Sequence, residues 1–435
     1  MQLSGREPTF RNIRPRSNPY RILVWIILIV LGLVVVRSLN SGEIRPLFLP
    51  TPTPTRTSNS YALEGETHFM AGDLDKAIAA YQLATMADTG NPQLWAELAR
   101  IQTYSSNLLT TDAEKVARLQ DALANINRAK ELAPEDSTVR AIRAFVLDWN
   151  ATLAGSDAGD MLAEAYQEAL QAIQLDPANT LALAYYAEVL VDQQKWLQAQ
   201  QYANQAAKQN PNLMDVRRIN AYVLESLGDY NNAIEEYKAA VSINPNLTFL
   251  YISIGKIYRH LEIYDKALEY FAKAANINEQ LGIKDPIPYL AIANSYVQQG
   301  QFFIAARNVL KALQLNPTSP DVYAQLGLVY HKSRNYEGAI PALECGLLGC
   351  SADISCEVRQ CDDTVDPQVV VQGMPLTDNT VVYYFTYGSV LAGLHREGDD
   401  YCVRAMDILN QVKASYSGDP TIMGIVVAGQ EICSK

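Results

Sequence analysis

Cysteine is the residue type whose number and spacing most clearly indicate chemistry in this sequence. The chain has six cysteines: Cys345, Cys350, Cys356, Cys361, Cys402 and Cys433. The first four lie within seventeen residues and form two pairs, with four residues between the members of each pair. Four thiolates could hold a zinc ion, but the five residues between the pairs are few for such a site. An even number of cysteines in an oxidising compartment favours disulfides, and free thiols are the third alternative. We predict no metal site and, among the 15 pairings that six cysteines allow, Cys345 with Cys350, Cys356 with Cys361 and Cys402 with Cys433.

Motifs that carry catalysis are absent from the sequence. No G-x-S-x-G, H-E-x-x-H, G-x-x-x-x-G-K-[ST] or glycine-rich dinucleotide loop occurs. The four histidines are scattered, and neighbouring acids such as Glu235 and Glu236 are typical of solvated helix surfaces. We therefore predict no catalytic residue, no cofactor and no enzymatic activity. An enzyme whose residues converge from distant parts of the chain is the least favoured alternative.

The charge of the chain argues against nucleic acid as a partner. Its 435 residues carry a net charge of −12, with a pI near 4.9, whereas neutralising phosphates requires a basic surface. The charge is also uneven, because residues 1–57 hold eight arginines and two glutamates and the remainder therefore carries −18. Hydrophobic residues make up 49% of the chain, which excludes wholesale disorder.

A membrane anchor is predicted near the start of the chain. Residues 22–36 carry no charge between Arg21 and Arg37 and are almost all aliphatic. We predict a transmembrane anchor over 22–39 after a basic tail over 1–21. A cleaved signal peptide is the main alternative, but no small-x-small cleavage site follows the apolar segment. A buried helix of a soluble domain is the third alternative.

The arginines also predict the topology. Five of them lie within residues 1–21, so we expect the N-terminus in the cytoplasm and the acidic part outside it, in the envelope of a bacterial cell. After the anchor, prolines alternate with threonines from 50 to 55. This composition predicts an extended linker over 40–59 that holds the following domain away from the bilayer.

An internal repeat dominates the rest of the sequence. Asp176-Pro177, Asn210-Pro211 and Asn244-Pro245 recur at two intervals of 34 residues. In each unit, aromatic and aliphatic residues at helical spacing precede a turn, and a second segment carries small residues seven positions apart. This pattern predicts two antiparallel helices in each unit.

The repeat resembles the tetratricopeptide repeat (TPR). In the copy over 214–247 the resemblance rests on Asn220, Ala221, Leu224, Gly228, Asp229, Tyr230, Ala233, Tyr237, Ala240 and Pro245. The resemblance implies an all-α solenoid of TPR-type helix pairs, wound as a right-handed superhelix. We place this solenoid at 60–346, a Cys-rich irregular segment at 347–380, and a degenerate repeat with a capping helix at 381–435.

Three insertions interrupt the repeat pattern. About ten extra residues separate the helices of the second and third copies, around 103–113 and 148–158, and residues 281–285 separate two regular copies. We expect loops or longer helix ends at these places. Within the Cys-rich segment we expect a short strand at 369–371.

The resemblance also implies where a partner binds. In this family the first helices of successive repeats line the concave side, which here places along the groove Arg218, Tyr222, Lys256, Arg259, His260, Asn294, His331 and Lys332. Several of these residues are basic, which in an acidic domain suggests a partner with an acidic or C-terminal carboxylate motif. The alternative is that they only solvate this face. The carboxylate clamp known in some members of the family is not reproduced.

These observations predict a membrane-tethered scaffold that binds a protein or peptide partner at the extracytoplasmic face. The alternative is a self-assembling structural subunit of a surface layer or filament, because repeat arrays stack end to end when a terminal helix is left open. A homo-oligomer is the expected form under that alternative.

Overall fold

The structure, a computed structural model, describes residues 18–40, 56–362 and 365–434. The chain divides into two compact units, Met1–Arg56 and Thr57–Lys435. The described part of the first unit is a helix, α1 (Pro19–Asn40), which contains an apolar stretch, Pro19–Ser38, with a mean hydropathy of 2.5. By length and composition α1 is a candidate membrane span or signal sequence. Most of the predicted tail and linker lies outside the described residues.

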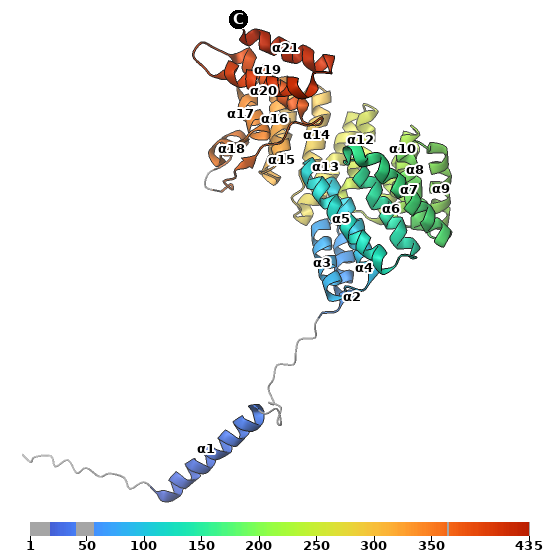
Figure 1. The fold of residues 1–435 in the computed structure, drawn as a ribbon, viewed down its shortest axis with the longest axis vertical. Coiled ribbons are helices and arrows are strands. Elements are labelled where there is room, and N and C mark those ends of the chain that lie inside the picture. The colour runs from blue at the N-terminus through green and yellow to red at the C-terminus, as the bar shows by residue number, and fades with distance from the viewer. Residues whose placement is uncertain (1–17, 41–55, 363–364, 435) are drawn as a thin grey trace, which may run out of the picture. The chain divides into compact units, whose positions relative to one another are not determined.

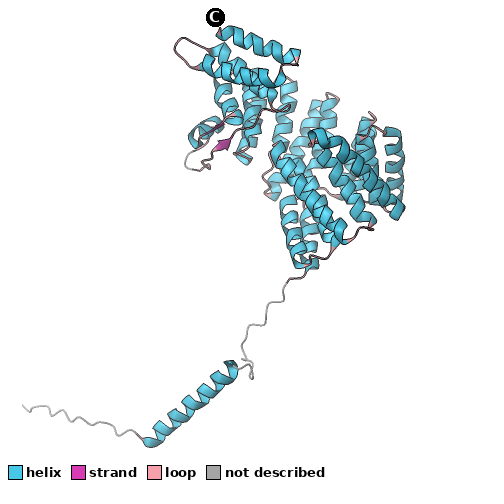
Figure 2. Cartoon of the chain, viewed as in Figure 1, coloured by secondary structure: helices cyan, strands magenta, loops and turns pink. Residues whose placement is uncertain are grey.

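The second unit consists largely of antiparallel helix pairs that follow one another along the chain (Figure 1, Figure 2). The pairs are α2 (Ser58–Met70) with α3 (Leu74–Ala87), α4 (Pro92–Ser105) with α5 (Asp112–Leu132), α6 (Ser137–Ala151) with α7 (Ala158–Leu175), α8 (Thr180–Asp192) with α9 (Trp196–Gln209), α10 (Met214–Ser226) with α11 (Tyr230–Ile243), α12 (Thr248–His260) with α13 (Tyr264–Leu281), α14 (Ile287–Gln298) with α15 (Phe302–Leu315), and α16 (Pro320–Lys332) with α17 (Tyr336–Leu347). This arrangement confirms the predicted solenoid of TPR-type helix pairs.

The pair α10–α11 shows why the repeat sequence folds in this way. Gly228 lies between the two helices with φ of +78°, a left-handed conformation that favours glycine. The Asp229 carboxylate then caps α11 by accepting a hydrogen bond of 3.4 Å from the amide of Asn232. The buried face of α11 combines small residues, which let helices approach, with larger ones that fill the space: Ala233, Ile234, Tyr237 and Ala240.

The close approach of paired helices depends on glycine at Gly255 of α12. A Cβ atom there would lie 2.3 Å from the Cε1 atom of Phe271, a fully buried residue of α13. We predict that Gly255→Ala lowers the free energy of unfolding by about 1–3 kcal/mol because the helices must separate. Urea unfolding of the two proteins measures the difference. Gly159→Ala on α7, where an added Cβ meets nothing within 4 Å, is the matched control and should be neutral or stabilising by up to about 1 kcal/mol; equal losses in both variants would contradict the prediction.

The solenoid winds so that early repeats contact later ones across the inner face. The hydroxyl of Thr110 lies 2.7 Å from that of Ser319, and both residues are buried. The rings of Tyr104 on α4 and Phe249 on α12 stack with their centroids 5.3 Å apart. These contacts divide the inner face into separate pockets, in place of the single open groove that the repeat pattern suggests.

The insertions in the repeat pattern form both loops and longer helix ends. Around 103–113, α4 is followed by a short 3-10 helix, η1 (Ser106–Leu108), and a loop. Around 148–158, η2 (Gly155–Asp157) separates α6 from α7. The third insertion comes after α13, which continues to Leu281.

Asp285, in this third insertion, is a buried acid that makes stability depend on pH. Its carboxylate accepts hydrogen bonds of 2.9 Å from Asn278 Nδ2 and from the amide of Ile287, but burial raises its pKa from 3.8 to about 6. The folded state therefore binds a proton more tightly than the unfolded chain, and the resulting stabilisation is lost as the pH rises from about 4 to about 6.

We predict that Asp285→Asn removes this loss. Between pH 4 and pH 7 the free energy of unfolding of the parent should fall by about 2–3 kcal/mol relative to that of the variant. Urea unfolding at a series of pH values measures this difference, in which the titration of all other groups cancels. A difference that does not change with pH would contradict the prediction.

Beyond α17 the regular pairs give way to the Cys-rich segment and a final group of three helices. A two-stranded antiparallel sheet joins β1 (Gly349–Cys350) to β2 (Val371–Gln372), with α18 (Ala352–Arg359) between them in the chain. The strand expected at 369–371 thus begins at Val371. The last helices are α19 (Val381–Leu394), α20 (Tyr401–Tyr416) and α21 (Pro420–Cys433).

The cysteines of this region lie in three pairs at disulfide distance. The Cα atoms are 4.7 Å apart in Cys345–Cys350, 5.1 Å in Cys356–Cys361 and 5.3 Å in Cys402–Cys433, within the usual range for disulfides. The first two pairs close short turns of the Cys-rich segment. The third pair joins the start of α20 to the end of α21.

Candidate functional site

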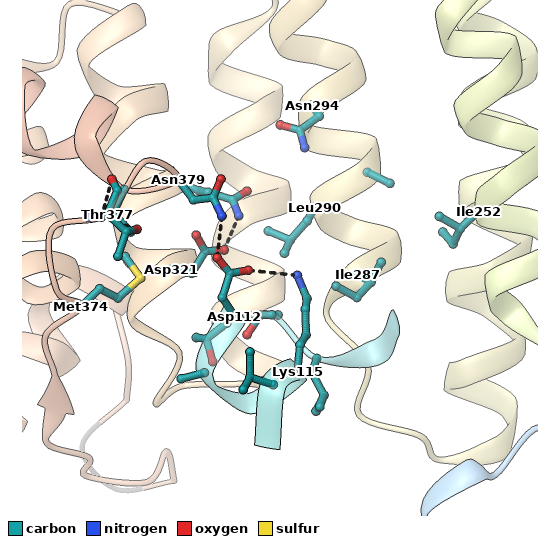
Figure 3. A pocket seen from close by; sticks show the side chains of 18 of the residues that line it. Asp112, Lys115, Ile252, Ile287, Leu290, Asn294, Asp321, Met374, Thr377 and Asn379 are labelled. Atoms are coloured by element: carbon teal, nitrogen blue, oxygen red, sulfur yellow. Dashed lines mark hydrogen bonds and ion pairs between the residues drawn. The ribbon is translucent and has the colours of Figure 1, made fainter. Parts of the chain in front are cut away.

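A pocket of about 550 Å³, here called the central pocket, lies on the inner face of the solenoid (Figure 3). The helices α12, α14 and α16 form one part of its wall. Residues 109–116, at the start of α5, and residues 374–380, from the segment before α19, form the rest. Ile252 of α12 lies across the pocket from Asp112 of α5 (Figure 3). Two departures from the repeat pattern therefore complete the pocket.

Hydrogen bonds hold these two irregular segments in place. Thr110 contacts Ser319 as described above, and Asn379 Nδ2 donates to Asp112 Oδ2 at 2.7 Å. Thr111 and Glu114 form a capping box that fixes the first turn of α5. The non-repeat wall of the pocket is thus positioned by specific side-chain contacts to α16 and to the segment before α19.

The central pocket is lined by apolar and polar side chains, with three cations among them: Lys115, which lies near Asp112, and Lys256 and Arg259. The apolar residues are Leu109, Ala113, Val116, Ile252, Ile287, Leu290, Ala291, Met374 and Pro375. Lys256 and Arg259 lie three positions apart on α12 and so share one face of that helix. Burial lowers the pKa of Lys256, and the positive charge of Arg259 lowers it further; burial also lowers the pKa of Arg259.

These two cations have no carboxylate partner within ion-pair distance among the residues that the structure describes. Arg259 Nη1 donates a long hydrogen bond, of 3.5 Å, to the carbonyl oxygen of Ala291. The two acids of the pocket are engaged elsewhere, since Asp112 lies 3.7 Å from Lys115 Nζ, and Asp321 accepts a hydrogen bond of 2.6 Å from Gln325. Burial also raises the pKa of Asp321.

Two predicted groove residues, Arg218 and Tyr222, line a second pocket of about 280 Å³. Arg218 is only 6% exposed, and its guanidinium donates to both carboxylate oxygens of Glu188, at 2.8 and 2.6 Å. The Tyr222 hydroxyl donates to Asp192 at 2.6 Å. The charge of Arg218 is therefore neutralised inside the protein.

Four more of the predicted residues line pockets. Lys256, Arg259 and Asn294 belong to the central pocket. Asn294 also lines a third pocket, of about 230 Å³, together with Lys332. Sequence spacing thus brings these residues to the inner face, but the structure distributes them over different pockets.

The two predicted histidines are not among the residues that line the central pocket or the second and third pockets. The His260 ring nitrogen Nε2 lies 2.9 Å from the hydroxyl of Tyr230. The His331 ring packs against that of Tyr336, with 5.7 Å between centroids. Both side chains contact the tyrosine that begins the second helix of a repeat.

Lys332 also belongs to a surface that combines exposed apolar side chains with positive charge. Phe303 is 79% exposed and Ile304 is 40% exposed at the start of α15. With Phe302, Lys332 and Arg334 they surround a hollow of about 400 Å³. These five residues are called the edge patch below. Neither Lys332 nor Arg334 has an ion-pair partner among the described residues.

A buried network centred on Asp215 was not predicted from the sequence. Its carboxylate accepts hydrogen bonds from Arg100 Nη1 at 3.1 Å, from the Tyr104 hydroxyl at 2.5 Å and from the Tyr185 hydroxyl at 2.6 Å. No local signal marks this network, because two of the partners lie more than a hundred positions away. The irregular wall of the central pocket was also missed, although the insertions around 103–113 and within 347–380 mark it.

Comparison with known proteins agrees with these helix pairs. Tetratricopeptide repeat models match residues 186–247 and 250–281, and a TPR repeat model matches residues 293–333. The chain is similar to a solved structure described as a thermophilic TPR protein in Thermus thermophilus, with 16% identity and a TM-score of 0.38 over 46% of this chain and 98% of that one. No curated protein matches the chain. The stretches at 186–247, 250–281 and 293–333 thus match tetratricopeptide repeat models, and each lies on paired helices of the solenoid.

Proposed function

We propose that this protein is a non-enzymatic scaffold, tethered to a membrane by α1, that binds a protein partner at the extracytoplasmic face. TPR repeats imply a protein-interaction scaffold. The apolar character of α1 and the five arginines before it support an anchor with its N-terminus in the cytoplasm. Three cysteine pairs at disulfide distance support an oxidising compartment for the solenoid.

The edge patch is the observation that carries this proposal. An exposed phenylalanine beside two cations has the composition of an interaction surface, because aromatic side chains supply contact area and cations supply electrostatic selection. The chemistry of the patch fits a partner segment that carries both acidic and apolar side chains. Tethering would raise the local concentration of such a partner at the membrane.

Capture of the partner tests the proposal. The full-length protein is crosslinked mildly in its native membranes and purified, beside the variant Phe303→Ser/Lys332→Ala. The matched control is Leu197→Ser/Lys208→Ala, because Leu197 is the second residue of α9 as Phe303 is of α15, and is 75% exposed. We expect a defined partner that is lost in the first variant and retained in the control. Retention of the partner in both variants would remove the edge patch from the proposal.

Self-assembly is the second candidate, and the terminal helix favours it. α21 buries only Val426 and Gly429, while Val427 and Ile432 are 41% and 49% exposed. Exposed apolar side chains on a terminal helix of a repeat array offer contacts to a second copy. Growth of the particle size with protein concentration would support this candidate over the scaffold, if the variant Val427→Glu abolishes that growth.

A further inference from the structure

Contacts bound the central pocket on two sides, which a continuous peptide-binding groove does not have. An extended peptide needs a continuous channel along successive first helices, but Thr110 and Ser319 meet across the inner face. Residues 374–380 close another side, held through the hydrogen bond between Asn379 and Asp112. The resulting volume of about 550 Å³ lies within the range typical of sites for small ligands.

The lining of the pocket combines apolar and charged side chains. Ile252, Leu290 and Met374 belong to an apolar wall contributed by three separate parts of the chain. Lys256 and Arg259 present positive charge from one helix face. The charge of Glu225 acts on Lys256, but no carboxylate among the described residues lies within ion-pair distance of either cation. Arg259 is half-buried and Lys256 is exposed, so both cations are available to give charge-assisted hydrogen bonds to an anion in the pocket.

The acids in the wall do not supply that anion. Asp112 lies near Lys115 and accepts from Asn379, and Asp321 accepts from Gln325 and, at 3.5 Å, from the Tyr383 hydroxyl. The net charge of the protein does not attract an anionic ligand from a distance, because the part of the chain after residue 57 carries a net charge of −18. An anionic ligand must therefore be held by local contacts with Lys256 and Arg259 together with apolar burial.

We propose that the central pocket binds a small amphiphile with one apolar chain and an anionic head group. The apolar chain of this ligand lies against Ile252, Leu290 and Met374. Its head group accepts hydrogen bonds from Lys256 and Arg259. A long extended peptide is a poorer fit, because residues 109–116 and 374–380 bound the pocket on two sides. This site uses none of the residues of the edge patch and is independent of the scaffold proposal.

Photolabelling of the full-length protein in phosphatidylcholine nanodiscs tests this inference. The probe is myristate that carries a diazirine on its chain, and labelled peptides are located by mass spectrometry. We expect labelling in the segments that line the pocket, around 252–259, 287–294 and 374–380. Labelling of α1 by probe dissolved in the bilayer gives an internal measure of probe concentration.

Three comparisons make the test specific. Unlabelled myristate should compete at the pocket, and uncharged tetradecanol should compete about tenfold or more weakly because it lacks the anionic head. Lys256→Ala/Arg259→Ala should reduce pocket labelling by about tenfold while leaving α1 labelling unchanged. The matched control is Lys266→Ala/Lys273→Ala, which removes the same charge from exposed positions of α13 outside the pocket.

Ala113→Trp supplies a second route to the same conclusion. Ala113 lines the pocket and is exposed on the first turn of α5, so the larger side chain should fill the pocket without disturbing the core. In the Ala113→Trp variant, labelling of the pocket should fall while labelling of α1 stays the same, and the circular dichroism spectrum should match that of the parent. The inference is overturned if labelling is confined to α1, if tetradecanol competes as well as myristate, or if a peptide ending in apolar residues competes better than myristate.

Discussion

Replacing Asp215 by alanine is expected to lower the free energy of unfolding by about 3–5 kcal/mol. Asp215 is 6% exposed and neutralises Arg100, which is 8% exposed. Burial alone would raise the pKa of Asp215, but Arg100 and the hydroxyl groups of Tyr104 and Tyr185 outweigh burial and lower it. Removal of the carboxylate leaves the buried guanidinium with Glu97 as its remaining partner and two buried hydroxyls without an acceptor.

Urea unfolding of the parent and the variant measures this loss. Asp75→Ala is the matched control, because the Asp75 side chain is 84% exposed and its ion pair with Arg118, at 3.5 Å, faces solvent; we expect a change of no more than about 0.5 kcal/mol. Since the pKa of Asp215 is lowered on folding, its stabilisation should be present above its ordinary pKa and should disappear on acidification, in the parent but not in Asp215→Ala. A loss below about 1 kcal/mol at neutral pH would show that the network does not stabilise the winding of the solenoid.

The Asp215 network could not be predicted from the sequence, although the helix pairs that carry it could. The spacing of Asp-Pro and Asn-Pro steps predicts the helix pairs, because a regular pair such as α10–α11 folds from residues within 34 positions. Asp215 meets Tyr104 across 111 positions, and that contact depends on how tightly successive pairs wind. The winding is a sum of small rotations between neighbouring repeats, which no local pattern specifies.

Arg218 illustrates the same limit for the candidate site. Its position on the first helix of a repeat follows from the sequence pattern, but its ion pair with Glu188, one repeat earlier, does not. The central pocket was only partly foreseen for a related reason. Lys256 and Arg259 lie on a regular repeat, whereas Asn379 comes from an irregular segment whose docking on α5 is not encoded by any periodicity.

Removing the pair Cys402–Cys433 is the second large effect that we expect. Its sequence separation of 31 corresponds to a loop-closure stabilisation of about 3–4 kcal/mol, against about 2 kcal/mol for the separation of five in Cys345–Cys350. Cys402→Ser/Cys433→Ser should therefore destabilise α21 more than Cys345→Ser/Cys350→Ser destabilises the Cys-rich segment. Amide hydrogen exchange of α21 and of residues 345–361, measured in each variant and in the parent, reports the local opening of both regions.

The burial of α21 makes this helix the informative one. Only Val426 and Gly429 are buried on it, and at Gly429 an added Cβ would lie 2.7 Å from a methyl carbon of Leu409 on α20, so the packed contact is close but small. If the disulfide supplies most of the local stability, amides of α21 in the double-serine variant should exchange about a hundredfold or more faster, with α19 and α20 unchanged. Unchanged exchange in α21 would mean that packing against Leu409 holds the helix without the disulfide, and that the exposed side chain of Val427 lies on a stably folded helix.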